Sequence, residues 1–291
     1  MTVHIENEFL TATFAEKGAE LISLKAKENG LEYIWQADPN YWARHAPVLF
    51  PIVGRLKEDT YHYQNQAYHL SQHGFARDLD FEVIEKGAET VAFALSATAE
   101  TKKNYPFDFH LVITYSLTGQ ELTVHYQVEN SGQETMYFSI GGHPAFNVPL
   151  DSSLSFEDYY LSFTPKKSRT QIPLQGPYAD FENKTLAQTN TDVNLTHAIF
   201  QNDALIFETK GTNSFCIMSD ESPHSVTLTI TDMPFVGIWS PAAKKAPFVC
   251  IEPWCGIADA VQTNGVLSDK IGINQLSPAG RFQTSYTISV K

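Results

Sequence analysis

The sequence predicts an all-β protein built as one large antiparallel β-sandwich. Apolar residues alternate with polar or small ones along most of the chain, the two-residue period of strands with one buried and one solvated face. No long segment has the 3.6-residue period of an amphipathic helix, which argues against βαβ units and helix bundles. The aromatic content, with 19 Phe and 13 Tyr, also suits the pleated, half-buried surface of a sheet.

The expected elements follow one another without a long interruption. Alternating apolar positions predict strands at 91–95, 111–117, 122–128, 226–230 and 282–290, and an apolar run predicts one at 246–251. The turn at 118–121 contains Gly119 and joins two of these strands as a hairpin. Short helical turns are expected at 98–105 and 195–202. Because no Gly/Ser/Pro-rich linker divides the chain, we expect a single domain over residues 1–291.

Charge and cysteine content restrict the partners and the compartment. The net charge of −13 disfavours a nucleic acid, whose phosphates require a basic surface, and equally disfavours an anionic membrane. No apolar run approaches the roughly 18–20 residues that span a bilayer. An odd number of cysteines, three, does not make a complete disulfide framework, and the opening residues lack the features of a secretory signal. We therefore expect a cytoplasmic protein.

Four short stretches interrupt the alternation, and each sets Gly or Pro beside polar residues. They span 51–56 (PIVGRL), 72–77 (QHGFAR), 141–147 (GGHPAFN) and 250–255 (CIEPWC). Glycine lets a ligand or a backbone approach closely, and proline fixes the direction of the chain. These stretches are the candidate functional segments.

The candidates for acid/base chemistry are His143 and Glu252. His143 lies between a Gly pair and a Pro, so it is not a regular ladder residue of a central strand, and histidine titrates near neutral pH. Glu252 follows the expected strand at 246–251 and would share a face with Cys250, where burial would raise its pKa. Taken alone, the pattern around His143 is just as typical of a histidine that bonds the backbone of a turn. The pattern around Glu252 is just as typical of a glutamate in solvent at the exit of a strand.

Further polar residues are candidates for ligand binding. His73 and Arg77 could hold hydroxyls or an anionic group, since arginine offers donors in a fixed fork. A turn-capping histidine and a surface arginine would leave the same pattern, and Arg55 has the same ambiguity. Asp203 is in isolation most typical of a turn residue or a helix cap.

The sequence contains no cofactor signature. The spacing of Cys250 and Cys255 does not match a zinc ligand pair, so we expect no metal. Phosphate-binding glycine loops and the nucleophile elbow of serine hydrolases are also missing. We expect chemistry that needs no cofactor.

In their order and spacing the four stretches resemble the aldose 1-epimerase (galactose mutarotase-like) superfamily over nearly the whole chain. The segment GGHPAFN at 141–147 is most similar to the LacX-like branch, and QHGFAR at 72–77 is also similar to hexose-6-phosphate mutarotases. The resemblance implies a single antiparallel "supersandwich" with a sugar in a cleft on a concave face. It also implies a cofactor-independent isomerase that interconverts the α and β anomers of an aldohexose.

The resemblance further implies residue roles. His143 matches the general acid and Glu252 the general base, whereas Arg55 and His73 match residues that contact sugar hydroxyls. Asp203 matches a further hydroxyl-binding acid, and Trp239 and Phe146 are expected to be walls of the pocket.

The sequence departs from galactose mutarotases after His143 and in the shortened Gly54–Arg55 stretch, where the substrate is selected. A hexose-6-phosphate 1-epimerase, with Arg77 facing the phosphate, and a non-catalytic carbohydrate sensor therefore remain alternatives. A glycoside hydrolase is disfavoured because only one convincing inward carboxylate is present. We expect a monomer or a homodimer.

Overall fold

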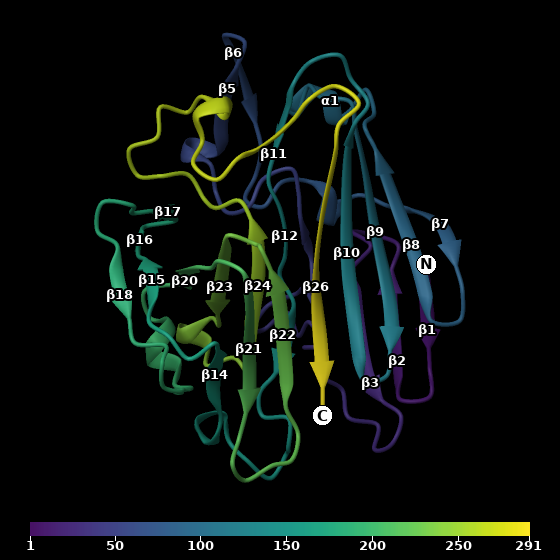
Figure 1. The fold of residues 1–291 in the computed structure, drawn as a ribbon, viewed down its shortest axis with the longest axis vertical. Helices are drawn as coiled ribbons and strands as arrows, with labels where there is room; N and C mark the ends of the chain where they lie inside the picture. Colours follow the sequence, from purple (N-terminus) through teal and green to yellow (C-terminus); the bar gives the residue numbers. More distant parts are fainter.

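The computed structural model describes residues 1–291 and is dominated by two large antiparallel sheets (Figure 1). The larger sheet has nine strands in the order β19 (Val193–Asn194), β14 (Tyr160–Thr164), β21 (Thr212–Met218), β22 (Val226–Thr231), β26 (Arg281–Val290), β10 (Glu121–Asn130), β9 (Phe109–Thr118), β8 (Thr90–Ser96) and β7 (Glu82–Lys86). The all-β prediction is confirmed. Gly119 and Gln120 join β9 to β10, which confirms the predicted hairpin.

The second sheet has eight strands and carries the candidate residues His143 and Glu252. Its order is β18 (Thr185–Ala187), β15 (Arg169–Ile172), β20 (Leu205–Glu208), β23 (Phe235–Trp239), β24 (Phe248–Cys255), β12 (Ile140–Gly142) and β4 (Val48–Leu49), and β13 (Ala145–Asn147) also pairs with β24.

Smaller elements surround these sheets. The remaining strands are β1 (Thr2–Glu6), β2 (Leu10–Ala15) and β3 (Leu21–Ala26) in one sheet, and the pairs β5 (Thr60–Tyr63) with β6 (Gln66–His69), β11 (Met136–Phe138) with β25 (Asn274–Leu276), and β16 (Leu174–Gln175) with β17 (Tyr178–Ala179). The helical turns expected at 98–105 and 195–202 are α1 (Thr101–Asn104) and the 3-10 helix η4 (His197–Phe200). The other 3-10 helices are η1 (Lys57–Asp59), η2 (Ala76–Asp78), η3 (Phe156–Asp158), η5 (Ala242–Lys244) and η6 (Leu267–Asp269). None of these helices could span a membrane, since the longest of them have four residues.

The two large sheets face each other across a shared apolar core. This core is one cluster of 63 buried residues, and it includes Val124 of β10, Ile288 of β26 and Ile251 of β24. Strand β10 shows why its sequence alternates, because every second side chain is buried in this core. Burial of this apolar surface is the main force that holds the two sheets together.

Strand β24 differs because all eight of its residues are buried. Val249 and Ile251 point into the main core, whereas Phe248 and Cys250 belong to a separate cluster on the opposite face. The prediction that a strand ends at residue 251 is wrong, since β24 continues through Pro253 to Cys255. Glu252 therefore lies inside a strand.

The pairing of β24 explains how a proline is accommodated there. Strand β13 pairs with positions 248–250 and β12 with positions 254–255, so the ladder is interrupted between them, opposite His143 and Pro144. The Ile251 N–H still donates to the Pro144 carbonyl at 3.2 Å. Because N–H groups alternate in direction along a strand, the N–H that Pro253 lacks would point to this same side, where regular pairing is already broken. The interruption places His143 directly beside Glu252.

Candidate active site

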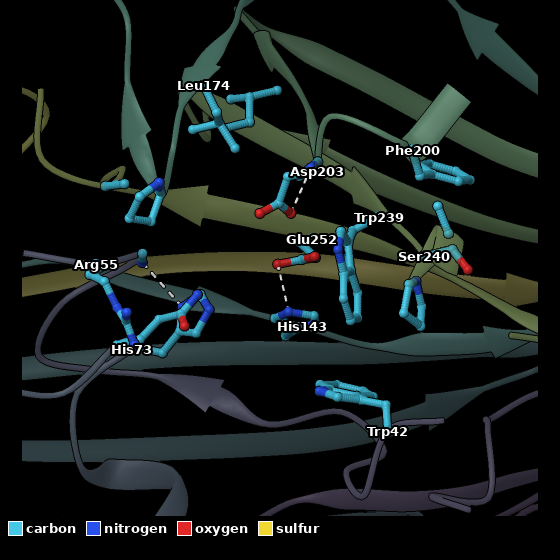
Figure 2. Close-up of a pocket in the computed structure, with 18 of the residues that line it drawn as sticks. Trp42, Arg55, His73, His143, Leu174, Phe200, Asp203, Trp239, Ser240 and Glu252 are labelled. Atoms are coloured by element: carbon cyan, nitrogen blue, oxygen red, sulfur yellow. Dashed lines mark hydrogen bonds and ion pairs between the residues drawn. The ribbon is translucent and has the colours of Figure 1, made fainter. Parts of the chain in front are cut away.

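A cavity of about 600 Å³ lies on the outer face of the eight-stranded sheet, over β24. Most of the predicted site residues line it, namely Arg55, His73, Arg77, His143, Asp203, Trp239 and Glu252. All of these except Arg77 are labelled in Figure 2. They come from loops and strands far apart in the sequence. The volume is in the range of about 300–1,000 Å³ that is typical of small-molecule sites.

His143 and Glu252 form a buried pair at the floor of this cavity. The His143 Nε2 lies 3.1 Å from Glu252 Oε2, and the two side chains are 9% and 3% exposed. Burial lowers the pKa of His143 to about 3, and the nearby charges of Arg77 and Arg44 also lower it. Burial also raises the pKa of Glu252 well above its usual value, and the charge of Asp203 adds to this effect. Both shifts favour a neutral imidazole with a neutral carboxyl over an imidazolium with a carboxylate, and the two groups are close enough to share one proton.

His73 lies beside this pair with a defined tautomer. Its ring centroid is 5.5 Å from that of His143, and its Nδ1 accepts a hydrogen bond from the Gly54 N–H at 3.1 Å. Burial lowers the pKa of His73 well below its usual value, so the ring is neutral at pH 7. Since Nδ1 is an acceptor, the proton lies on Nε2, which makes that atom a hydrogen-bond donor.

The polar residues at the rim have different surroundings. Arg55 is 41% exposed, and its Nε lies 3.4 Å from Asp59. Arg77 donates from Nη2 to the Gln72 carbonyl, and burial lowers its pKa to about 10, so it stays cationic at neutral pH. Asp203 has a φ of 75° and accepts the Ala204 N–H at 2.8 Å.

The aromatic walls differ from the prediction at one position. Trp239 lines the cavity, but Phe146 does not, because its side chain is fully buried in the main core. Neighbouring side chains on a strand point to opposite faces, and Phe146 follows Ala145, which belongs to the outer cluster. The wall that the sequence analysis missed is Trp42, whose ring stacks on His143 with centroids 4.8 Å apart.

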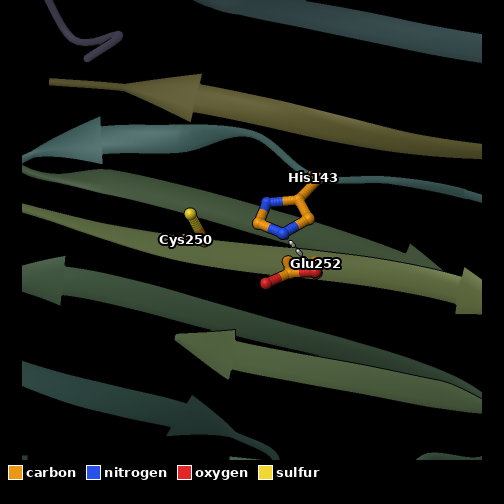
Figure 3. Close-up of side chains that lie close together, drawn as sticks. All are labelled: His143, Cys250 and Glu252. Atoms are coloured by element: carbon orange, nitrogen blue, oxygen red, sulfur yellow. Dashed lines mark ion pairs between the residues drawn. The ribbon is translucent and has the colours of Figure 1, made fainter. Parts of the chain in front are cut away.

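Cys250 lies on the same face of β24 as Glu252, as predicted. Its thiol is a third potential metal ligand beside His143 and Glu252. The candidate ligand atoms of His143, Cys250 and Glu252 all lie within 4.8 Å of one another (Figure 3). Cys255 belongs to the main core on the other face of β24, so the two cysteines do not share a site. An ion bound to His143, Cys250 and Glu252 would compete with protons for these residues.

Several buried polar atoms around the cavity make no hydrogen bond within the protein. A buried nitrogen or oxygen without a hydrogen bond occurs in Arg55, Arg77, His143, Ser240 and Trp254. Such groups cost free energy unless a partner is supplied, and they gather around one cavity here.

Known proteins resemble the whole chain. The family model "Aldose 1-epimerase" matches residues 1–266. The chromosomally encoded protein LacX of Lactococcus lactis subsp. lactis is 34% identical over 300 residues, which cover 100% of this chain and 99% of LacX. A galactose mutarotase related enzyme from Lactobacillus acidophilus has a TM-score of 0.99 and 42% identity, covering 100% of this chain and 97% of its own. A galactose mutarotase-like protein from Lactobacillus casei ATCC 334 has a TM-score of 0.91 and 38% identity, with both chains fully covered.

These matches bear out the fold and the family that the four segments predict. The matched structures share the large antiparallel sandwich, and the relatives extend over the same length as this chain. With a sugar-sized cavity over β24 and a buried His/Glu pair at its floor, the chain belongs to the aldose 1-epimerase family of isomerases, in its LacX-like branch.

Proposed function

We propose that the protein is a mutarotase that interconverts the anomers of a free aldohexose without a cofactor. The observation that carries the proposal is the 3.1 Å distance between His143 Nε2 and Glu252 Oε2 at the floor of the cavity. The ring oxygen and the anomeric hydroxyl of a sugar are bonded to the same carbon. One closely spaced donor and acceptor can therefore serve both oxygens at once.

In the proposed reaction the pair first becomes an imidazolium and a carboxylate, by transfer of the Glu252 proton to His143. The carboxylate takes the proton of the C1 hydroxyl while His143 Nε2 protonates the ring oxygen. The bond from C1 to the ring oxygen breaks, and an aldehyde forms at C1. This leaves a protonated Glu252 and a neutral His143, the state favoured by their environments.

Rotation about C1–C2 then exposes the other face of the aldehyde. As the C5 hydroxyl attacks C1, His143 takes its proton and Glu252 protonates the former carbonyl oxygen. The other anomer is released, and the pair regains its starting protons. The number of protons is balanced over the cycle, so the chemistry needs no oxidant or external acid.

The other cavity residues are proposed to bind the sugar. The neutral His73 can donate from Nε2, Arg55 can donate from its guanidinium, and Asp203 can accept from a hydroxyl. Trp42 and Trp239 provide aromatic faces for the apolar side of the ring. We do not include Phe146, since its side chain lies in the core.

Polarimetry with α-glucose and α-galactose tests the proposal. The wild type should accelerate mutarotation above the buffer rate, and Glu252→Gln should reduce kcat by about 10²–10⁴-fold because the carboxylate base is removed. A wild-type rate equal to buffer would favour the non-catalytic carbohydrate sensor. Equal rates for wild type and variant would remove Glu252 from the mechanism.

A hexose 6-phosphate is the second candidate substrate, and Arg77 is the observation that favours it. Its guanidinium lines the cavity and remains cationic, and its Nε makes no hydrogen bond, with Asp78 3.8 Å away. Arginine binds phosphate through charge-assisted hydrogen bonds. If the substrate is phosphorylated, Arg77→Gln should raise KM for glucose 6-phosphate and galactose 6-phosphate but not for the free sugars.

A further inference from the structure

A buried ion pair lies behind the wall of the cavity, outside the proposed acid/base pair. Lys270 Nζ lies 2.8 Å from Asp259 Oδ1, and both side chains are 3% exposed. Burial lowers the pKa of Lys270, and the negative charge of Asp259 opposes this shift. Neither side chain lines the cavity. Because a buried charge without its partner is strongly destabilising, each residue depends on the other.

The second oxygen of Asp259 holds the segment 54–57, which carries Arg55. Asp259 Oδ2 accepts the Lys57 N–H at 2.9 Å, and the Asp259 N–H donates to the Arg55 carbonyl at 2.9 Å. One carboxylate thus joins the buried ammonium to the backbone that follows Arg55. The bond to the Arg55 carbonyl fixes the residue itself.

The same segment is also packed closely on the other side of Arg55. Gly54 has a φ of 73°, and a Cβ added to it would lie 2.5 Å from the Cβ of Ala258. Only glycine allows this approach, which brings the Gly54 N–H to His73 Nδ1. The backbone around Arg55 is therefore anchored to residues 258–259 on both sides.

We propose that the Asp259–Lys270 pair positions Arg55 and the tautomer-defining amide of Gly54 for sugar binding. The Arg55 side chain is 41% exposed, and Asp59, 3.4 Å from its Nε, is its ion-pair partner. Its direction therefore depends on the anchored backbone together with this one ion pair. Asp259 and Lys270 are positioning residues that act through Arg55, and this role rests on the proposed mutarotase function.

Asp259→Asn tests the role with little change in shape. The carboxylate accepts from Lys270 and from Lys57 on separate oxygens, whereas an asparagine has a single acceptor oxygen. One of the two donors must therefore lose its partner. Because the segment that carries Arg55 is then held less firmly, we expect KM to rise at least about tenfold while kcat changes less than about threefold.

Glu208→Gln is the matched control. Glu208 pairs with Lys184 on the surface, where both side chains are 36% exposed. This variant also removes one carboxylate charge from an ion pair but leaves the segment 54–57 untouched. Its KM should equal that of the wild type.

A double-mutant cycle with Arg55→Gln separates positioning from a general structural effect. If Asp259 acts through Arg55, Asp259→Asn should change KM less than about twofold in the Arg55→Gln background. Lys270→Gln, whose amide can still donate to Asp259, should show the same dependence with a smaller rise in KM. This second variant decides the question if Asp259→Asn does not fold. Multiplicative KM effects, or an unchanged KM in both variants, would overturn the proposal.

Amide hydrogen exchange gives a readout that needs no activity. In Asp259→Asn the amides of Gly54 and Lys57 should exchange faster than in the wild type, and those of the β9–β10 hairpin should not. Unchanged exchange at both amides would refute the anchoring. If the wild type shows no mutarotation but Asp259→Asn still speeds exchange at these two amides, the result counts against the proposed function alone.

Discussion

Trp42 is predicted to stabilise the reactive form of His143. Its ring stacks on the imidazole at 4.8 Å with an interplanar angle of 28°, and its edge meets Trp239 at 5.8 Å. The position is fixed from outside the cavity, because the Trp35 indole donates to the Trp42 carbonyl at 2.9 Å. In the proposed reaction the imidazole becomes a cation against this aromatic face.

Replacing Trp42 by leucine keeps an apolar wall but removes the π face. A cation–π contact contributes about 0.5–2 kcal/mol. Because the cation exists only in the reactive form, the loss should appear in kcat, as a reduction of about 2- to 30-fold. Trp42→Phe keeps an aromatic face and should recover most of the rate.

Initial rates of mutarotation, measured by polarimetry over a range of sugar concentrations, separate kcat from KM for both variants. A raised KM with an unchanged kcat in Trp42→Leu would refute this reasoning, since it would make Trp42 only a wall for the sugar. A Trp42→Phe variant no more active than Trp42→Leu would show that ring shape, and not the π face, is what matters.

Three further predictions concern the core, pH and metal ions. Phe146→Ala should lower the free energy of unfolding by about 3–5 kcal/mol in urea denaturation, since its side chain fills the main core, and a small loss typical of a cavity wall would contradict this placement. His73 has a lowered pKa in the folded protein, so the unfolded chain takes up this proton at a higher pH and the free energy of unfolding should fall as pH drops below about 6.5. His73→Gln should reduce the slope of the free energy of unfolding against pH by up to about 1.4 kcal/mol per pH unit. An unchanged slope would show that His73 is protonated when folded. Zn²⁺ should inhibit mutarotation by binding the ligand atoms of His143, Cys250 and Glu252, and Cys250→Ala should weaken that inhibition; equal inhibition of both proteins would place the ion elsewhere.

Alternation predicts where strands occur but not which face they turn to the site. It correctly indicated the β9–β10 hairpin and the shared face of Cys250 and Glu252. In β24 both faces are buried, so hydrophobicity could not show where the strand ends, and Glu252 was placed at its exit. The expectation for Phe146 is wrong for another reason, because an aromatic residue suits the core as well as a cavity wall.

The contacts of Trp42 could not be predicted from local sequence. It lies in an irregular segment before β4, and its contact with His143 depends on how distant parts of the chain meet. The available signal was a Trp beside a Tyr in a stretch with no alternation. The Asp259–Lys270 pair gave no signal either, since isolated charged residues are usually exposed. The order of strands within the two sheets is likewise a property of long-range pairing.

The proposed reaction requires His143 and Glu252 to act as one unit, and a double-mutant cycle measured by polarimetry tests this directly. Residues that share one proton-transfer cycle have non-additive effects on turnover. His143→Asn, Glu252→Gln and the double variant should therefore all lose about the same factor in kcat, roughly 10²–10⁴-fold, with an unchanged fold. Near-normal turnover in either single variant, or a double variant whose loss is the product of the two single losses, would contradict the shared-proton mechanism.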